Sequence, residues 1–363
     1  MTGEWWEYLM VFGASISFCL VLTPVALAVA ARSGMFDQPG AHKSHASPVP
    51  YLGGVAIIVA FAAAVIGAAI IYPPESGVGE LWVVLLLAVG LAFVGLADDL
   101  RNLSPVVRIA LEVLCAVQLW RMDAGITLTG DQTVDLALTV LWVVGITNAF
   151  NLLDNMDGLA AGQAAICAMT IFAVAAANGQ FLVAALAIAL AGCAVGFLRH
   201  NFYPARIYMG DGGALFIGFL IAYLGIKLRF EAQFLLPSAF ESFLVPVLVC
   251  SLPIMDTTLV TISRFSTGRS PFQGGQDHFS HRLVKIGLPV PAVVMLTYVV
   301  SAGIGVLSFV ISRIDPVDPV SARILTGLII STLLLVAVLL AMVPVYSESS
   351  RRHFEIGERP TDG

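Results

Sequence analysis

The sequence has few charged residues, and this shortage restricts what the protein can be. Of its 363 residues, 12% are Asp, Glu, Lys or Arg, whereas 58% are hydrophobic and the mean hydropathy is +0.92. Soluble domains carry about 25% charged residues, so the composition indicates a membrane protein. The net charge of −6 argues against nucleic acid as a partner.

Cysteine is also scarce. The five cysteines all fall in apolar stretches and none belongs to a CxxC pair: Cys19, Cys115, Cys167, Cys193 and Cys250. This placement predicts small buried residues rather than a disulfide framework or a zinc site. The N-terminal MTGEWWEY lacks the basic segment of a signal peptide, so the first apolar run is expected to remain as a helix.

Apolar runs close to the roughly 20 residues that cross a bilayer recur along the whole chain. We therefore predict an all-α, polytopic integral membrane protein, with residues 1–346 as the transmembrane domain and residues 347–363 as a polar cytoplasmic tail. Its fourth span contains Arg108 and Glu112, which a tilted helix lining a polar cavity can accommodate. The eleven expected spans are 8–31, 52–72, 81–97, 106–121, 134–150, 158–177, 181–198, 213–229, 240–262, 290–312 and 320–346.

Basic residues predict the orientation of these spans. An odd number of spans places the two termini on opposite sides, and thirteen of the 18 Lys and Arg residues fall on the side of the C-terminus. Because basic residues gather in cytoplasmic loops, we expect the N-terminus outside and the C-terminus in the cytoplasm. Nearly every potentially reactive side chain then lies in a cytoplasmic loop.

One polar stretch, NAFNLLDNMDGLAAG at 148–162, interrupts two apolar runs. If the fifth span stays helical past Asn148, then Asn148, Asn151 and Asn155 recur on one face, and Asp154 and Asp157 continue it. Charged groups at membrane depth are costly and usually mark a site. The alternative is a solvated turn capped by Asn and Asp.

Two further stretches place carboxylates at cytoplasmic span ends. GLADDLRNLSP contains Asp98 and Asp99, and IYMGDGGALFIG contains Asp211. Carboxylates brought together need neutralising, and oxygen ligands suit Mg²⁺ or Mn²⁺, which fill their shells with water and substrate phosphates. These stretches predict a Mg²⁺ site and a phosphate-bearing substrate, although Asp211 alone could be a helix N-cap.

Basic and histidine residues occur in two further cytoplasmic loops. In GRSPFQGGQDHFSHRLVK, His278, His281 and Arg282 would suit a diphosphate, and the first loop adds Lys43 and His45. Solvated loop residues are the alternative for both.

Taken in order, the Lys-x-His loop with GGVAI, then ADDL, NAFNLLDNMDGL, MGDGG and DHFSHRL resemble the motifs of the polyprenyl-phosphate N-acetylhexosamine-1-phosphate transferases (glycosyltransferase family 4). The resemblance runs from about Asp37 to Lys285 and extends to the eleven-span layout of the branch that uses UDP-N-acetylglucosamine. It implies transfer of a sugar 1-phosphate from a UDP-sugar to undecaprenyl phosphate with release of UMP, dependence on Mg²⁺, and a bacterial plasma membrane location with the active site facing the cytoplasm.

The resemblance also implies residue roles. Asp211 matches a Mg²⁺ ligand of the family and Asn151 an amide close to that metal. Asp98 and Asp99 match an aspartate pair, one member of which is a proposed base for the lipid phosphate. The remaining predicted catalytic and substrate-binding residues are Asp154 and Asp157 of the DxxDG motif, Lys43, His45, Asn148, His278, His281 and Arg282.

Two departures from the family pattern bear on the sugar. Ser280 stands where the late loop commonly has a middle histidine, and His42 stands where the first loop often has arginine. The runner-up activity is the phospho-N-acetylmuramoyl-pentapeptide transferase, whose typical TPTMGG segment and triple histidine are missing here. A proton- or sodium-coupled transporter is a further alternative, which the carboxylates at span ends disfavour. The sequence does not determine the sugar epimer, the prenyl length, the polymer served or the course of the reaction. It also leaves the oligomeric state open, with a homodimer as one possibility.

Overall fold

Helices make up nearly all of the part of the chain that the computed structural model describes, which is residues 3–37, 48–73, 77–228, 239–272 and 274–313 together with 327, 330 and 332. The predicted all-α fold is confirmed. The helices are α1 (Trp5–Ser33), α2 (Gly53–Ile71), α3 (Val78–Arg101), α4 (Pro105–Arg121), α5 (Gln132–Leu153), α6 (Leu159–Ala177), α7 (Phe181–Asn201), α8 (Gly210–Lys227), α9 (Ala239–Val249), α10 (Ser251–Ser266), α11 (Phe279–Lys285) and α12 (Val290–Arg313).

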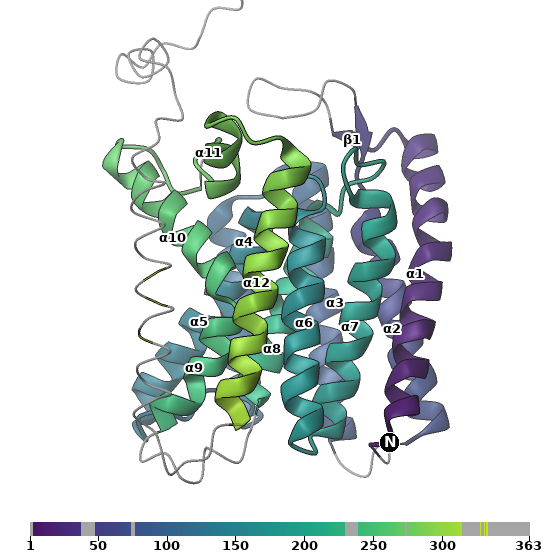
Figure 1. Ribbon diagram of the computed structural model, residues 1–363, viewed down its shortest axis with the longest axis vertical. Helices are drawn as coiled ribbons and strands as arrows, with labels where there is room; N and C mark the ends of the chain where they lie inside the picture. Colours follow the sequence, from purple (N-terminus) through teal and green to yellow (C-terminus); the bar gives the residue numbers. More distant parts are fainter. Residues whose placement is uncertain are drawn as a thin grey trace, which may run out of the picture.

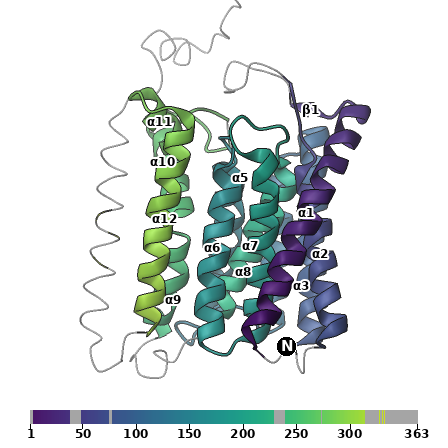
Figure 2. The ribbon, with the colours of Figure 1, turned by 45° about the vertical axis from the view of Figure 1, so that its right-hand side comes forward.

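The long helices run side by side as one bundle (Figures 1 and 2). The start of α1 lies at one end of this bundle, and α11 and the strand β1 (Phe36–Asp37) lie at the other. Strand β1 pairs antiparallel with β2 (Val49–Pro50). We call the end that carries β1 and α11 the loop end; that it faces the cytoplasm remains a prediction.

Eight of the described helices are long and apolar enough to cross a membrane, namely α1, α2, α3, α5, α6, α7, α8 and α12. In lipid, a helix satisfies its backbone hydrogen bonds internally, which explains why these apolar runs are helical throughout. The predicted fourth span corresponds to α4, which is 17 residues long. The predicted eleventh span and the polar tail lie outside the described ranges apart from three isolated positions, so the count of eleven stays a prediction.

The predicted ninth span coincides with a bent pair of helices. Residues 240–262 form α9 and α10, which meet at Cys250 with a bend of 70°. Helix α10 is less apolar than its neighbours, because it buries Asp256 and Arg264 on one side. The bend directs α10 toward the loop end beside α11 (Figure 1).

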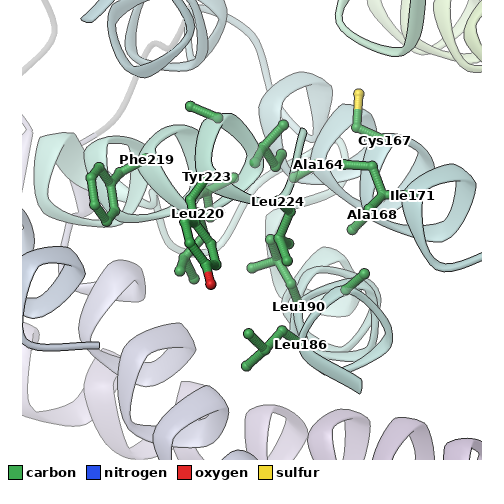
Figure 3. Close-up of a cluster of buried hydrophobic side chains, with 14 of the residues drawn as sticks. Ala164, Cys167, Ala168, Ile171, Leu186, Leu190, Phe219, Leu220, Tyr223 and Leu224 are labelled. Atoms are coloured by element: carbon green, nitrogen blue, oxygen red, sulfur yellow. The ribbon is translucent and has the colours of Figure 1, made fainter. Parts of the chain in front are cut away.

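Helix α8 is the centre of the bundle. Every residue from Gly212 to Ile226 is buried, as expected of a helix that is hydrophobic on all sides. Figure 3 shows Leu224 of α8 lying beside Ala164 of α6 and Leu190 of α7 within this core. The start of α8 therefore has a fixed position with respect to the helices around it.

Glycines bring α2 and α3 close to the start of α8. A Cβ atom on Gly54 of α2 would lie 2.4 Å from the backbone nitrogen of Gly213, and one on Gly95 of α3 would lie 2.5 Å from the backbone of Asp211. Close approach of backbones through small residues is the usual way that membrane helices associate. Here it places Asp211 directly beside the end of α3.

Candidate active site

The end of α3 supplies the adjacent carboxylates Asp98 and Asp99. Asp98 Oδ1 accepts a hydrogen bond of 2.6 Å from the backbone nitrogen of Leu103, in the turn that leads to α4. Asp99 Oδ1 accepts one of 3.2 Å from the backbone nitrogen of Asp211. Gly210, just before Asp211, has φ +74°, and a side chain there would lie 2.7 Å from Asp99 Oδ2. The first glycine of MGDGG, Gly210, is therefore required by the close approach of the Asp99 side chain.

Asp211 lies between an amide and a guanidinium. Its Oδ1 accepts a hydrogen bond of 2.8 Å from Asn151 Nδ2 on α5, and its Oδ2 is 3.4 Å from Nη1 of Arg108 on α4. The predicted pairing of Asp211 with Asn151 is thus observed as a contact. Asp211 is not the N-cap of α8, because Met209 occupies that position.

Arg108 links side chains of three other helices, namely the carboxylates of α3 and α8 and an amide of α5. Its Nη1 also lies 2.9 Å from Asp98 Oδ2, and its Nη2 donates to Asn148 Oδ1 at 3.5 Å. Glu112, one turn along α4, is fully buried and accepts a hydrogen bond from Asn148 Nδ2. The sequence placed Arg108 and Glu112 beside a polar cavity, but it assigned neither a role in the site.

The predicted helical face from Asn148 to Asp157 is only partly correct. Helix α5 ends at Leu153 and Asp154 is its C-cap, so Asn155 and Asp157 belong to the turn that leads to α6. Asp157 Oδ2 accepts a hydrogen bond of 2.8 Å from the backbone nitrogen of Ala205, in the segment before α8. The DxxDG turn reaches the same region as Asp211, but it does so as a loop and not as a continued helix.

The aspartates described above line one cavity of about 450 Å³ at the loop end, whereas Asn151 and Arg108 contact Asp211 without being part of the lining. The five predicted carboxylates all take part, since its lining includes Asp98, Asp99, Asp154, Asp157 and Asp211. The lining residues that the sequence did not single out include Asp37, Tyr51, Asn102, Asn201 and Tyr208. We call this space the acidic cavity.

Charge repulsion within the acidic cavity affects Asp154. Burial raises the pKa of this carboxyl to about 7, and the neighbouring charges of Asp211, Asp99 and Asp157 act in the same direction. A cation bound among these carboxylates would relieve the repulsion.

The late histidine loop divides its residues between this cavity and a buried network. His281 lines the acidic cavity, and burial together with the charge of His278 lowers its pKa to about 4. His281 is therefore neutral at neutral pH, and it can act there as a hydrogen-bonding group rather than as a counter-ion. Arg282 turns away, because its Nε donates to the backbone oxygen of Asp277 and its Nη2 to Ser263 Oγ, both at 2.9 Å.

Ser280, which replaces the middle histidine, is fully buried. Its Oγ donates a 2.7 Å hydrogen bond to Asn155 Oδ1, so it ties the late loop to the DxxDG turn. The predicted substrate-binding residues Lys43 and His45 lie outside the described residues, and their roles stay predictions.

With this geometry in place, the chain can be compared with known proteins. Residues 81–229 match the sequence model of the family described as "Glycosyl transferase family 4". The chain is 32% identical over 298 residues to the "Probable undecaprenyl-phosphate N-acetylglucosaminyl 1-phosphate transferase" of Bacillus subtilis (strain 168), and the match covers 80% of each chain. The chain belongs to glycosyl transferase family 4. The predicted family is confirmed.

Two further relatives carry different names. The "Decaprenyl-phosphate N-acetylglucosaminephosphotransferase" of Mycolicibacterium smegmatis is 29% identical over 350 residues, covering 87% of this chain and 83% of the relative. The "Phospho-N-acetylmuramoyl-pentapeptide-transferase" of Geobacillus kaustophilus is 31% identical over 309 residues, covering 77% and 90%. The family match at 81–229 contains five of the six carboxylates that line the acidic cavity, and it contains neither Asp37 nor the late histidine loop.

The donor set of the acidic cavity fits the Mg²⁺ that the family resemblance implies. Asp211 and Asn151 offer one carboxylate and one amide oxygen, and Mg²⁺ is bound in proteins by one or two carboxylates, with water and substrate phosphates completing its shell. Within the described residues, no group of three or more His, Cys, Asp or Glu side chains is arranged to hold a metal ion.

Proposed function

We propose that this protein transfers N-acetylglucosamine 1-phosphate from UDP-N-acetylglucosamine to a polyprenyl phosphate and releases UMP. The observation that carries the proposal is the acidic cavity, where the ends of α3 and α5 and the start of α8 bring five carboxylates together at one end of a membrane bundle. The names of the relatives in Bacillus subtilis and Mycolicibacterium smegmatis support the substrate classes.

In the proposed reaction, an oxygen of the lipid phosphate attacks the β-phosphorus of the UDP-sugar. A new phosphorus–oxygen bond forms, the bond from the β-phosphorus to the bridging oxygen breaks, and UMP leaves with that oxygen. Phosphoryl transfer needs mainly alignment and charge neutralisation from the protein. Mg²⁺, when bound, would supply that neutralisation at the diphosphate, held by Asp211 and the amide oxygen of Asn151.

The chain's own residues position the two substrates. Asp99 accepts the backbone N–H of Asp211 and so holds the start of α8 against α3. Asp98 and Asp211 share the guanidinium of Arg108, a fixed positive charge where two phosphate groups must approach each other. Asp157 is held by the backbone of Ala205, and we assign it to the nucleoside side of the cavity.

The proposed reaction also indicates a cellular location and a biosynthetic role for the protein. We propose a bacterial plasma membrane location with the loop end facing the cytoplasm, where UDP-sugars are found, and a role in the first membrane step of a cell-envelope polysaccharide. The runner-up substrate is UDP-N-acetylmuramoyl pentapeptide, because the Geobacillus kaustophilus relative is similarly identical. The first substrate is favoured because the chain lacks both the TPTMGG segment and the triple histidine that are typical of the muramoyl branch.

A radiolabel transfer assay on the purified full-length protein tests the proposal. The assay supplies undecaprenyl phosphate and Mg²⁺ and compares UDP-N-acetylglucosamine, UDP-N-acetylgalactosamine and UDP-N-acetylmuramoyl pentapeptide. We expect lipid-linked product from the first donor and loss of this product on chelation. Asp211→Asn should lower kcat by at least about 100-fold, which is the typical cost of removing a group that stabilises transition-state charge.

The matched control is Asp131→Asn. Asp131 is an exposed N-cap at the other end of α5, and asparagine caps a helix as well as aspartate does, so this variant should keep full activity. Product from the muramoyl donor alone would transfer the assignment to the runner-up. No product from any donor, in protein shown to be folded, would contradict the transferase.

A further inference from the structure

Asp256 is a buried carboxylate that the sequence placed inside an apolar span without any assigned role. It lies on α10 and is 1% exposed. Its Oδ2 lies 2.7 Å from His278 Nδ1, and its Oδ1 accepts a 2.9 Å hydrogen bond from the backbone nitrogen of Phe279. The bend of 70° at Cys250 sets the direction of α10, and Asp256 of that helix joins the first residues of α11.

The contact between Asp256 Oδ2 and His278 Nδ1 fixes which ring nitrogen of His278 carries a proton. A carboxylate oxygen only accepts hydrogen bonds, so Nδ1 must carry the proton. Nε2 is then the remaining hydrogen-bonding atom of the ring, and its protonation decides whether it donates or accepts. The ring lies edge-on to His281 with 6.0 Å between the centroids, and His281 lines the acidic cavity.

The preceding residue is held independently. Asp277 is 1% exposed and pairs with Arg264 Nε at 3.2 Å and with Arg269. Burial alone would raise its pKa, but the hydrogen bonds and charges of Arg269 and Arg264 hold it below the ordinary value. The backbone before His278 is therefore held by the ion pairs of Asp277, and these do not involve the His278 ring. The ring itself is held by Asp256.

We propose that Asp256 is a positioning residue for the transfer reaction, which holds the His278 ring with Nδ1 protonated and Nε2 presented beside the acidic cavity. The inference rests on the proposed function and on the role in holding the diphosphate that the sequence predicts for His278. Capping of α11 alone would use Oδ1 only; the bond from Oδ2 to the ring is the additional feature that a capping role does not require. A carboxylate behind a histidine is a general device for fixing tautomer and orientation.

Asp256→Asn separates the two roles. Asparagine has one accepting and one donating end, so it can satisfy the backbone nitrogen of Phe279 or Nδ1–H of His278, but not both. We expect kcat/KM to fall by about 10- to 100-fold, the equivalent of one hydrogen bond to a charged group. Asp131→Asn, at the opposite end of the bundle, is the control for the isosteric change itself.

A double-mutant cycle shows whether Asp256 acts through His278. His278→Gln should lower kcat/KM by a similar factor, and adding Asp256→Asn to it should lower it by less than about 2-fold further, because residues that act as one unit are not additive. Equal losses in both backgrounds would overturn the proposal and leave Asp256 as a purely structural residue.

The nitrogen-15 spectrum of the wild-type histidines provides a test that needs no active variant. The chain has six histidines, and His278→Gln identifies the signal of interest. We expect Nδ1 of His278 to be protonated in the resting protein; an unprotonated Nδ1 would refute the proposal even if Asp256→Asn is inactive or unfolded. If no donor is turned over, the proposed function fails on the transfer assay, while the spectrum still decides how Asp256 holds the ring.

Discussion

Replacing Asp154 by asparagine tests whether a buried negative charge in the acidic cavity lowers the stability of the folded protein. Burial and then the charges of Asp211, Asp99 and Asp157 raise the pKa of Asp154 from 3.8 to about 7. The folded protein therefore keeps a proton on this carboxyl in a range where the unfolded chain has lost it. Between these two values the folded state binds more protons, so its stability falls as the pH rises from about 4 to about 7.

The size of the effect follows from the same two values. The difference between 3.8 and about 7 corresponds to an upper bound of about 4 kcal/mol, lost in full once the pH exceeds the folded pKa. The asparagine side chain of the variant carries no charge at any pH. We therefore expect Asp154→Asn to be more stable than the wild type at about pH 8, by up to about 4 kcal/mol, and this excess should shrink steadily as the pH falls toward about 4.

The measurement is the free energy of unfolding in detergent micelles, from denaturant titrations at several pH values without divalent cations. Asp131→Asn should stay within about 0.5 kcal/mol of the wild type throughout, as surface substitutions do. A stability difference for Asp154→Asn that is absent at about pH 8, or that does not change with pH, would refute the charge argument. Mg²⁺ should narrow the difference if it binds among the same carboxylates, and transfer activity should fall in the variant because Asp154 is a predicted catalytic residue.

Three further perturbations test the packing and the charges around the cavity. Gly54→Ala should cost about 1–3 kcal/mol, because its Cβ would lie 2.4 Å from the backbone of Gly213, whereas Gly67→Ala on the same helix meets nothing within 4 Å and should leave the unfolding free energy unchanged or slightly raised. Arg108→Lys keeps the charge but loses the planar guanidinium, whose Nη1 lies between Asp98 and Asp211 while its Nη2 reaches Asn148, so kcat/KM in the transfer assay should fall; unchanged kinetics would show that a single cationic nitrogen is sufficient. Tyr298→Phe removes a hydroxyl donated to a backbone carbonyl in the turn before α6 and should cost about 1 kcal/mol in the same denaturant titrations, with no loss indicating that the carbonyl finds another donor.

The repeated spans and the order of the motifs were predictable because both are local in sequence. A run of apolar residues in lipid must form a helix to satisfy its own backbone, whatever lies beside it. The placing of carboxylates at span ends follows from the same boundaries, so the five cavity aspartates were predicted together. The family motifs placed Asn151 and Asp211 near one metal ion, and the structure shows a hydrogen bond between them.

The structure adds a helix end and a helix bend that the sequence pattern did not indicate. The helical spacing from Asn148 predicted that Asn155 shares a face with Asn151, yet α5 ends at Leu153 and the chain turns into α6. Residues 240–262 are apolar enough for one span, but α9 and α10 meet at 70°. Apolar composition reports that a segment is buried in lipid or protein, and it carries no information about the direction of the helix axis.

The order of residues along the chain is enough to establish a bundle of membrane helices with a family 4 set of acidic motifs at the helix ends. The groups that meet those motifs are known only from the folded arrangement: Arg108 at Asp211, Ser280 at Asn155, and Asp256 at His278. The physical reason is that such contacts depend on how closely helices distant in the sequence approach one another. At the acidic cavity that approach is set by glycines of α2, α3 and α8, whose missing side chains allow the backbones to touch.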